Sequence, residues 1–566
     1  MWVGYRSVCT RLCHLEVAGV QFGYESGFLQ LGAVARERYT IAYGYRRPDG
    51  KFKTLPRMRG DVKLRAKGRV ERLDIPRVSL GVHVDGAVLP SPDPNDFNTL
   101  CGGVQKRIAL ERPVVDKSVL RDFRSFVRRF VVRNFQPLAS DTDLSVVRWL
   151  GQTNYPVWRR QQILDKWRRA GFALRNTHLW CTSFVKRESY FHDDGEYFKE
   201  ARTINSRSDA FKAYSGPVFA AIERQVYRLK SFIKHVPVAD RGQYISDYLG
   251  ASGAILYSTD YTSFEAHFTA EVMRACELQL YRHMLRNVAN GRVIAHNLVV
   301  ALSTKNRLNF HNLRVDVRAC RMSGDMCTSL GNGFTNLMLM LFAASRSGAR
   351  CRGVVEGDDG LFAVSKQVDV GVIEKLGFRI KLEKCEDLED ARFCSMCVSR
   401  ETKRVMCDPI KKVLNFGWSF SEMRLSPVKR PQLLRGKAIS ALCECPGVPI
   451  IHEMAKYVYR LTGGQSVKYS GLSGTKDYAE ERIGISDDKI QSSLEAVVDD
   501  RDRTLVERVY GLPIHVQLVA EKYFRECRTL GPVPLTVLSG LVPKISMLYS
   551  LRHVFNVAGK PMLWKR

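Results

Sequence analysis

The chain has 566 residues and 45% hydrophobic composition, which is enough for a large core. At about 100–200 residues per domain, about three lobes are expected. Its 88 Lys and Arg against 58 Asp and Glu give a net charge of +30, which opposes compaction and favours an anionic partner, usually nucleic acid. No run of about 18 apolar residues indicates a membrane span, so no direct transmembrane anchoring is expected.

Composition alone also allows a basic protein without a specific partner. The 15 cysteines are scattered and lack the tandem spacing of a zinc site. Cys394 and Cys397 form one CxxC pair, and Cys9, Cys13 and His14 lie close together near the start. Neither group has the second half that a zinc site needs, so reduced thiols are expected. The N-terminus also lacks the continuous apolar core of a signal peptide.

The first part of the chain is basic and turn-rich. Residues 40–77 are dense in Arg and Lys, and both an RNA entry surface and a solvated arm are open interpretations. Residues 90–98 predict a linker, and a second linker is predicted at residues 462–476. From residue 98 to about residue 250 the pattern is mainly helical and basic.

Within that helical part, residues 158–172 interleave two tryptophans with four arginines. Aromatic stacking combined with phosphate contacts is how proteins hold single-stranded nucleic acid without sequence preference. However, Trp158, Ile163 and Trp167 can also face a hydrophobic core. Both interpretations stay open, and the core interpretation is favoured.

The middle of the chain has a different pattern. Residues 254–260 predict a strand that ends in an acid, followed by a helix with Thr269 as its N-cap. Residues 328–344 predict a second, buried helix. Residues 352–364 predict two short strands joined by an acidic turn at Asp359-Gly360. This order predicts an α+β fold, with a sheet covered by helices on one face.

The acids in these strands indicate a metal-dependent chemistry. Two adjacent carboxylates at a turn are explained by solvation alone, so the hairpin by itself is weak support for catalysis. A strand-ending Asp260 beside the hairpin would lie near Asp358. Carboxylates together with substrate phosphates are the ligands that Mg²⁺ prefers, and two such ions support phosphoryl transfer.

The ordered motifs resemble the palm of viral RNA-dependent RNA polymerases. DYTSFE resembles motif A, with Asp260 as metal ligand and Glu265 where the family usually has a second Asp. SGDMCTSLGN resembles motif B, with Ser323, Gly324, Thr328 and Asn332 in the family positions, and GDD resembles motif C. The longer stretch CRMSGDMCTSLGN is similar to the tombusvirus-like group of positive-strand RNA viruses.

The resemblance implies roles for these residues. Asp260 and Asp358 would bind two Mg²⁺ ions, with Mn²⁺ as a substitute, and Asp359 would assist. Thr328 and Asn332, with Glu265, would sense the ribose 2′-hydroxyl, which separates RNA from DNA precursors. Glu265 is one methylene longer than the family's Asp, which puts its role in question. Ser323 and Gly324 would form a loop that flexes as template and nucleotide enter.

Two further segments resemble motifs that handle phosphates. VKRESYFHDDGEYFKEARTINSRSDAFKAYSGPVFAAIE resembles motif F, in which Lys186, Arg202 and Arg207 would bind the triphosphate. LGFRIKLEK resembles motif D, whose lysine protonates the leaving pyrophosphate; Lys381 and Lys384 both fit by position, and Lys381 is preferred. RFCSM resembles motif E, the hinge between palm and thumb.

The resemblance implies a right-hand polymerase with fingers, a ferredoxin-like palm and a mainly helical thumb. The expected boundaries are an unassigned basic extension at 1–95, fingers at 96–250 and 286–315, palm at 251–285 and 316–408, and thumb at 409–566. The implied partners are single-stranded RNA template, nascent RNA, NTPs and another viral replication protein. The expected location is the host cytoplasm, at membrane-associated replication complexes reached through partners.

Two other functions compete with an active RNA polymerase. A catalytically inactive, palm-fold RNA-binding protein would be expected to lose its metal acids first, and both are present. A reverse transcriptase shares this type of palm, but it normally has an aromatic or small residue ahead of the paired aspartates and lacks this motif B.

Overall fold

The computed structural model describes residues 57–547 with gaps at 68–77, 93, 95–96, 191–199, 251–252, 421–428, 466, 468–484, 539 and 545. Before residue 57 it describes four short strands: β1 (Glu16–Val17), β2 (Val20–Gln21), β3 (Gly44–Arg46) and β4 (Phe52–Thr54). Cys9, Cys13, His14 and most of the basic segment at 40–77 lie outside the described residues, as does most of the predicted linker at 462–476. The architecture is a mixed α+β fold with several small sheets.

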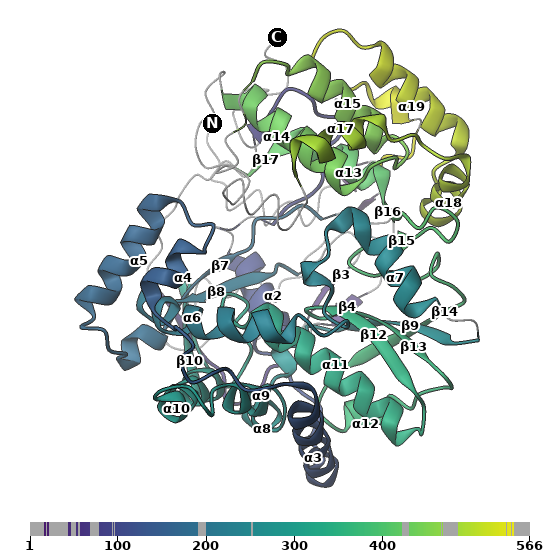
Figure 1. Cartoon of the computed structure of the whole chain (residues 1–566). Coiled ribbons are helices and arrows are strands. Elements are labelled where there is room, and N and C mark those ends of the chain that lie inside the picture. The colour runs from purple at the N-terminus through teal and green to yellow at the C-terminus, as the bar shows by residue number, and fades with distance from the viewer. Residues whose placement is uncertain are drawn as a thin grey trace.

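A four-stranded antiparallel sheet occupies the middle of the chain (Figure 1). Its spatial order is β12 (Cys351–Glu356), β13 (Asp359–Val364), β9 (Ile255–Tyr261) and β14 (Ile380–Cys385). The predicted strand at 254–260 and the predicted hairpin at 352–364 are therefore confirmed. The hairpin and the predicted strand also lie side by side, since β13 is hydrogen-bonded to β9.

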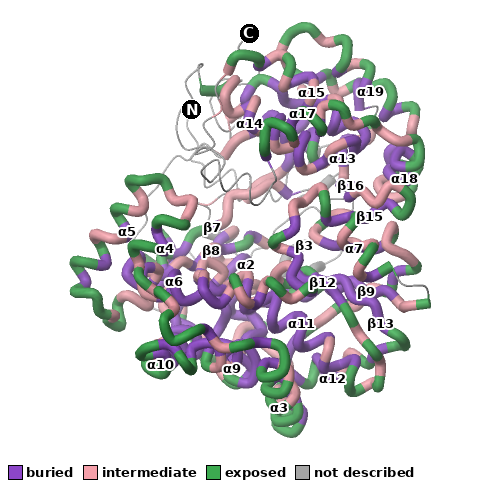
Figure 2. The backbone as a smooth tube through the Cα atoms, viewed as in Figure 1, coloured by how far each residue is buried: buried purple, intermediate pink, exposed green. Residues whose placement is uncertain are grey.

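Helices cover both faces of this sheet, because alternate side chains point to opposite faces. Tyr257, Phe362 and Val364 belong to the core that includes α11 (Thr328–Arg346). Leu256 and Leu361 belong to a second core with α7 (Arg241–Leu249). The expectation of helices on one face is wrong, since consecutive buried residues of β9 and β13 join the two cores in turn. Figure 2 shows that α11 is buried along most of its length.

The two predicted helices flanking the acids are present. Thr269 caps α8 (Ala270–Ala275), and its side chain accepts a hydrogen bond from the Val272 amide. At Cys276 the backbone leaves helical geometry (φ −116°, ψ −102°), so a separate helix, α9 (Glu277–Met284), follows. The predicted single helix is therefore two short helices. The second predicted helix is α11.

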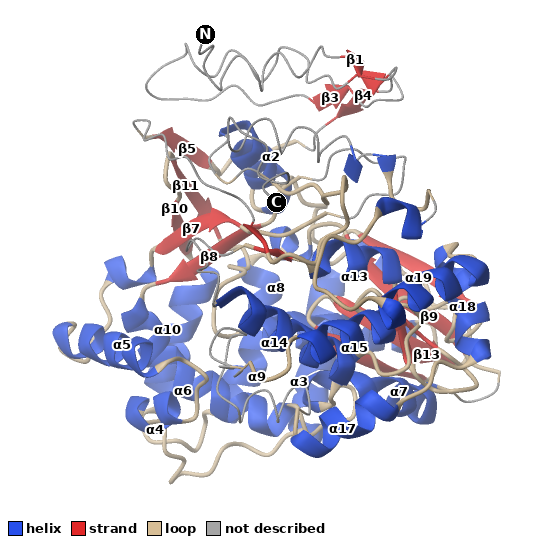
Figure 3. Ribbon diagram, turned by 90° about the horizontal axis from the view of Figure 1, so that it is seen from above, coloured by secondary structure: helices blue, strands red, loops and turns tan. Residues whose placement is uncertain are grey.

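A five-stranded sheet lies apart from the first one (Figure 3). Its strands, in spatial order, are β5 (Lys63–Ala66), β11 (Leu313–Arg318), β10 (Lys305–Asn309), β7 (Cys181–Val185) and β8 (Thr203–Arg207). β7 and β8 lie in the segment with a mainly helical pattern, which did not reveal them. β7 pairs with β10, which is more than a hundred residues away in sequence, and β8 pairs with β7.

The mainly helical pattern between residues 98 and 250 is otherwise confirmed. The helices there, besides α7, are α2 (Phe97–Arg107), α3 (Lys117–Asn134), α4 (Val146–Gly151), α5 (Val157–Arg169) and α6 (Asp209–Val226). In α5, Ile163 and Trp167 are buried, whereas Trp158 is 67% exposed. The favoured interpretation of this segment as a core helix therefore holds for two of the three residues.

The C-terminal part is mainly helical and has its own core (Figure 1, top). Residues 80–89 also belong to this core, since Leu80, Val82 and Leu89 pack into it and β6 (Val78–Ser79) pairs with β17 (Trp418–Ser419). The other elements after residue 286 are α10 (Gly291–Ser303), α12 (Gly371–Glu374), β15 (Met396–Val398), β16 (Val405–Cys407), α13 (Pro409–Phe416), α14 (Lys429–Glu444), α15 (Ile451–Leu461), α17 (Asp487–Glu495), α18 (Asp500–Tyr510) and α19 (Ile514–Glu526).

No helix among the described residues is both long enough and apolar enough to cross a membrane.

Candidate active site

Three carboxylates lie at one end of the central strands, β9 and β13, of the four-stranded sheet. Asp358 lies in the turn between β12 and β13, next to Gly357 at φ +67°, a backbone conformation that suits glycine. The register pairs Gly360 with Thr259, so one residue further along Asp359 comes opposite Asp260. All three acids are exposed to solvent. The sequence prediction that Asp260 lies beside the hairpin is confirmed.

Two polar side chains on the α11 side of the sheet, Asn336 and Tyr261, hold the hairpin turn in place. Asn336 of α11 donates a hydrogen bond from Nδ2 to the Asp358 carbonyl oxygen at 2.9 Å. The Tyr261 hydroxyl donates in turn to Asn336 Oδ1 at 3.1 Å. A Cβ at Gly360 would lie 2.9 Å from Asn336 Nδ2, so glycine permits this close approach. The fold therefore fixes the Asp358 backbone and leaves its carboxylate for a ligand.

The acids repel one another. Desolvation by the surrounding protein, together with the nearby charges of Glu265 and Asp359, raises the pKa of Asp358 to about 7. Desolvation also raises the pKa of Asp359, with Glu356 and Asp260 adding to the effect.

Lys381 lies directly opposite Asp260 on β14. Residues opposite each other in an antiparallel pair share a face of the sheet, so the Lys381 side chain leaves the same face as Asp260. Lys384 is opposite Tyr257 and points to the other face. Lys381 forms an ion pair with Glu383, which is the main cause of its raised pKa. Of the two lysines, only Lys381 lies next to an acid of the site.

Glu265 lies just after the acid-bearing strand, in a short 3-10 turn (Phe264–His267). Ser263 precedes this turn in the left-handed conformation (φ 55°), which redirects the chain after β9. The Glu265 carboxylate is close enough to Asp358 to raise the pKa of that acid. Its backbone carbonyl accepts a hydrogen bond from the Arg321 amide at 3.2 Å.

The loop before α11 is built around close backbone contacts. A Cβ at Gly324 would lie 2.8 Å from the Asn205 carbonyl oxygen of β8, so only glycine fits there without a shift. The Thr328 hydroxyl donates to the carbonyl oxygens of Met322 at 3.0 Å and Asp325 at 2.8 Å. Ser323 is half-buried in the same loop. The loop therefore packs against β8 and fixes the start of α11 beside that strand.

Asn332 lies one turn into α11 and is almost fully buried. Its Oδ1 accepts a hydrogen bond from Arg321 Nε at 3.1 Å. Arg321 forms a buried ion pair with Glu277, the first residue of α9. The sequence motif identified Asn332 but not these two charged partners.

Cations of the predicted motif F lie near the acids. Lys186 Nζ is 3.1 Å from Glu188, and Arg202 donates from Nε to the same carboxylate at 2.7 Å. Arg202 is close enough to Asp358 and Asp359 to lower the pKa of each slightly. Residues 191–199, between these two cations, lie outside the described residues.

Arg207 lies at the far end of β8 and is buried. It donates to Asp325 Oδ1 at 2.9 Å, to Asn306 Oδ1 at 2.7 Å and to the Leu179 carbonyl oxygen at 2.7 Å. In this structure Arg207 therefore connects β8 to the loop before α11. Contact between Arg207 and a triphosphate stays a prediction, and it would require these protein acceptors to be given up.

A family model described as viral RNA-dependent RNA polymerase matches residues 208–496, which is just over half of the chain and contains the acids, Glu265 and Asn332. The chain belongs to this family. The match begins within the segment that resembles motif F, after Lys186, Arg202 and Arg207, so these three cations lie outside it. Polymerases of this family use divalent metal ions.

Two curated proteins are also similar to this chain. The RNA-directed RNA polymerase of Red clover necrotic mosaic virus is 26% identical over 229 residues, which cover 38% of this chain and 29% of that protein. The RNA-directed RNA polymerase of Carnation ringspot virus (isolate Lommel) is 26% identical over 224 residues, or 37% and 28% of the two chains. The chain thus matches less than a third of the length of these relatives. The resemblance to a tombusvirus-like group is confirmed.

The donor set at the sheet edge fits a divalent cation. Carboxylate oxygens are the ligands that Mg²⁺ prefers, and it usually takes only one or two of them together with substrate phosphates. The raised pKa values of Asp358 and Asp359 show that desolvation and the neighbouring acids outweigh the positive charge of Arg202. Among the described residues, however, no group of three or more His, Cys, Asp and Glu is arranged to hold a metal ion.

The segment predicted to be motif E forms a tight turn against the acids. Phe393 and Met396 exchange backbone hydrogen bonds of 2.9 and 3.0 Å, and the two residues between them, Cys394 and Ser395, both have positive φ. The turn places the Cys394 thiol 3.9 Å from Glu356 Oε2. Cys394 and Cys397 are both free thiols.

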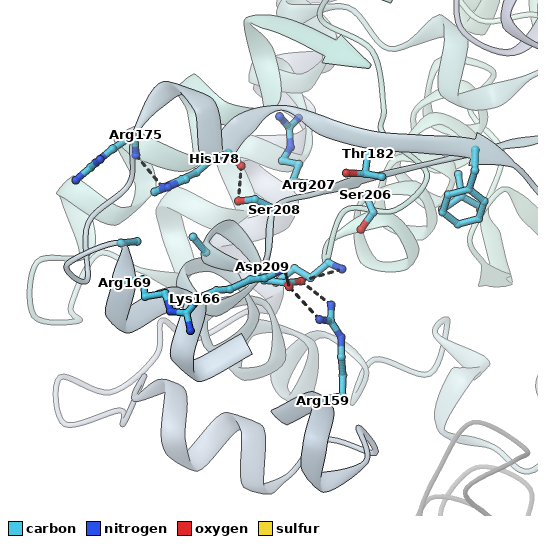
Figure 4. Close-up of a pocket in the computed structure, with 15 residues that line it drawn as sticks. Arg159, Lys166, Arg169, Arg175, His178, Thr182, Ser206, Arg207, Ser208 and Asp209 are labelled. Atoms are coloured by element: carbon cyan, nitrogen blue, oxygen red, sulfur yellow. Dashed lines mark hydrogen bonds and ion pairs between the residues drawn. The ribbon is translucent and has the colours of Figure 1, made fainter. Parts of the chain in front are cut away.

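An open pocket of about 710 Å³ lies between α5 and the strands β7 and β8 (Figure 4). Its charged residues include Arg159, Lys166, Arg169, Arg175, Lys212 and Asp209. Arg159 and Lys166 donate to the Asp209 carboxylate, which leaves the pocket with a clear excess of positive charge. None of the site acids lines it.

The pocket and the predicted triphosphate cations lie along one face of the β7–β8 hairpin. Thr182 and Phe184 of β7, with Ile204 and Ser206 of β8, line the pocket. Because side chains alternate along a strand, the next positions on this face are Lys186 and Arg202. Phe184 is 51% exposed. The face therefore runs from a cationic pocket, past an exposed aromatic ring, toward the acids.

Sequence reasoning missed several residues that build the site. Asn336 had a signal, because it is a second asparagine one turn after Asn332 in an otherwise apolar run. Asp325 and Arg321 lie within or beside motif B, but nothing in their spacing indicates their partners. Glu277 had no signal, because a glutamate at the start of a helix is usually solvated.

Proposed function

We propose that this chain is an RNA-dependent RNA polymerase, which transfers nucleotides from NTPs to a growing RNA on an RNA template and releases pyrophosphate. The observation that carries the proposal is the sheet edge where Asp260, Asp358 and Asp359 meet. The pKa of Asp358 is raised because desolvation and the neighbouring acids outweigh the positive charge of Arg202, and Asn336 holds the turn that carries Asp358. Family membership and the two similar viral polymerases support the same activity.

Two divalent ions held by Asp260 and Asp358, with Asp359 assisting, would lower the pKa of the attacking hydroxyl and neutralise the leaving phosphate. The protein's own contribution is position and charge. Lys186 and Arg202, which share Glu188 in the structure, would exchange that carboxylate for triphosphate oxygens. Glu265, Thr328 and Asn332 would contact the ribose, and Ser323 and Gly324 would let the loop before α11 move.

Lys381 is the proposed proton donor to pyrophosphate. Its position opposite Asp260, on the same face of the sheet, supports this choice over Lys384. The ion pair with Glu383 keeps Lys381 protonated, which is the state a general acid needs.

The elements suggest how a right hand would be arranged. The four-stranded sheet with α8, α9 and α11 would be the palm (251–285 and 316–408). The fingers (96–250 and 286–315) would contain α2–α7 and the strands β7, β8 and β10, and residues 409–566 would form the thumb. The five-stranded sheet also includes β5, from before residue 96, and β11, which ends at Arg318. Residues 80–89 pack into the C-terminal core, so we assign them to the thumb rather than to the extension at 1–95.

Single-stranded RNA is the proposed ligand of the cationic pocket beside α5. Its positive charge suits phosphates, and exposed Phe184 offers a surface on which a base can stack. Nascent RNA and NTPs are the other proposed ligands. Attachment to host membranes through another viral replication protein stays a prediction.

The direct test of the function is a primer-free assay on generic single-stranded RNA, with Mg²⁺ or Mn²⁺ and all four NTPs. Template-dependent synthesis of labelled RNA is the expected result. RNA binding without synthesis under both metals would favour an inactive RNA-binding protein. Synthesis from dNTPs alone would favour a reverse transcriptase.

The pocket is tested by the salt dependence of RNA binding. Replacing Arg169 and Arg175 by Ala should weaken binding and reduce the slope of log K against log[salt] by about 1.4, since each phosphate contact to a single strand contributes about 0.7. Arg128→Ala with Arg129→Ala, on the exposed face of α3, removes the same net charge outside the pocket and is the matched control. Equal slopes for the two double variants would remove the pocket from the RNA path.

A further inference from the structure

A buried ion pair lies beneath the proposed ribose-binding residues. Arg321 and Glu277 are joined through Nη2 and Oε2, with side-chain exposures of 1% and 0%. The Arg321 guanidinium also lies 4.5 Å from the centre of the Phe268 ring. A Cβ at Gly331 would come within 2.5 Å of Glu277 and 2.7 Å of Arg321, so glycine makes room for the pair.

Arg321 is connected to both polar residues proposed to sense the sugar. Its backbone amide donates to the Glu265 carbonyl oxygen at 3.2 Å. Its side-chain Nε donates to Asn332 Oδ1 at 3.1 Å. One buried residue therefore fixes the backbone of Glu265 and the carboxamide of Asn332.

The chemistry of arginine determines which way the Asn332 amide points. A guanidinium has five N–H donors and no acceptor, and it stays protonated in proteins, so it can only donate. The atom of Asn332 that faces Arg321 must then be the oxygen. This leaves the Nδ2 group, a donor, for contacts on the other side of the carboxamide.

We propose that Arg321 is a positioning residue for ribose selection, and that Glu277 is present to neutralise it. The inference rests on the proposed function and deepens it. A 2′-hydroxyl can both accept and donate a hydrogen bond. Arg321 sets Asn332 as the donor to the hydroxyl oxygen, and the Glu265 carboxylate accepts the hydroxyl proton. A 2′-deoxy sugar offers neither partner, so it is discriminated against at both residues.

The first test removes the pair without leaving a lone buried charge. Arg321→Met combined with Glu277→Leu replaces a buried ion pair by apolar residues of similar volume, a change that is often tolerated. The readout is the ratio of kcat/KM for an NTP to that for the matching 2′-dNTP. We expect the ratio to fall by about tenfold, since the polarity of one hydrogen-bonding group is no longer fixed.

A matched control exists in the C-terminal core. Arg503 and Glu521 also form a buried ion pair, with two contacts of 2.8 Å, in helices α18 and α19. Arg503→Met combined with Glu521→Leu should leave the sugar ratio unchanged, whatever it does to the melting temperature. A purely structural role for Arg321 would lower incorporation of both sugars equally, and an unchanged ratio in the Arg321 double variant overturns the proposal.

If the double variant does not fold, a second variant tests the assigned orientation of the Asn332 carboxamide. Asn332→Asp keeps an oxygen toward Arg321 but replaces the Nδ2 donor by a second acceptor. We expect this variant to lose most of its preference for ribonucleotides, while Asn332→Asp with an unchanged preference would overturn the assigned polarity. If wild-type protein incorporates no NTP with either metal, the proposed function itself fails, and that result is distinct from an unchanged ratio.

Discussion

Two charged clusters of this protein differ in whether their charges are neutralised by an ion-pair partner. At the sheet edge, Asp358 and Asp359 lie beside other acids, and desolvation by the surrounding protein together with these neighbouring negative charges raises the pKa of each. Beneath the same site, Arg321 and Glu277 are buried and paired with each other. The exposed acids leave negative charge available for a cation, whereas the buried pair neutralises itself and so can only hold neighbouring groups in position.

This difference indicates that the two clusters have different roles, one in the chemical step and the other in positioning. The acids contribute charge at the place where the reaction is proposed to occur, so removing one should affect chemistry more than folding. The ion pair contributes geometry, so breaking it should affect folding and selectivity more than the chemical step. The four predictions that follow test this division.

The largest effect is expected for Asp358→Asn. Loss of one ligand carboxylate at the turn should lower nucleotide incorporation by about 10³-fold or more, since metal-ion catalysis supplies several kcal/mol to such reactions. RNA binding, measured by fluorescence anisotropy, should persist. Asp369→Asn, at an exposed acid between β13 and α12, is the matched control and should retain activity. Undiminished synthesis by Asp358→Asn would refute the metal assignment.

Breaking only one half of the buried pair should destabilise the fold. Glu277→Ala leaves the Arg321 guanidinium buried without its counter-ion, which typically costs about 3–5 kcal/mol of unfolding free energy. Chemical denaturation would measure the loss. The Arg321→Met, Glu277→Leu double variant should be much closer to wild type. Equal destabilisation by the single and double variants would contradict the pairing.

Divalent metal binding should depend on pH. Because the pKa of Asp358 is raised to about 7 without a cation, the acid carries a proton below that pH, and a metal ion must displace it. Mn²⁺ affinity should therefore fall as pH drops below about 7, approaching tenfold per pH unit if one proton is displaced. In the absence of metal the sign for stability is opposite: the folded state binds the proton more tightly, so stability falls as pH rises from about 4 to 7.

Calorimetric titration at pH 6 and pH 8 would measure the metal affinities. The Asp358→Asn variant, which lacks the titrating group, should show a weaker pH dependence. An affinity that is equal at both pH values in the wild-type protein would contradict the prediction.

The smallest effect is expected at Glu265. Glu265→Asp withdraws the carboxylate by one methylene, toward the length usual in the family, and should change the NTP to dNTP ratio by about three- to tenfold, the range of a single hydrogen bond. Steady-state incorporation of matched NTP and dNTP pairs would measure it. Identical ratios in both forms would remove Glu265 from sugar sensing.

Much of the fold around the acids was predictable because its signals are local. The strand that ends at Asp260, the hairpin with Gly357, and the helix that follows Thr328 each depend on a few consecutive residues. The strands β7 and β8 were not predictable in this way. Five residues in each strand are too few for a clear pattern. In addition, β7 pairs with the distant strand β10, and β8 joins the sheet only through β7.

The residues of the candidate site also divide into those that the sequence identified and those whose contacts only the tertiary structure revealed. The sequence by itself determined the identity and order of Asp260, Asn332, Asp358 and Asp359, because each is part of a motif read along the chain. Tertiary structure alone decided that Arg321 meets Glu277, which is 44 residues away, and that Arg207 meets Asp325, which is 118 residues away. A buried charge needs a partner, but which partner it finds depends on how distant elements pack, and no local pattern records that.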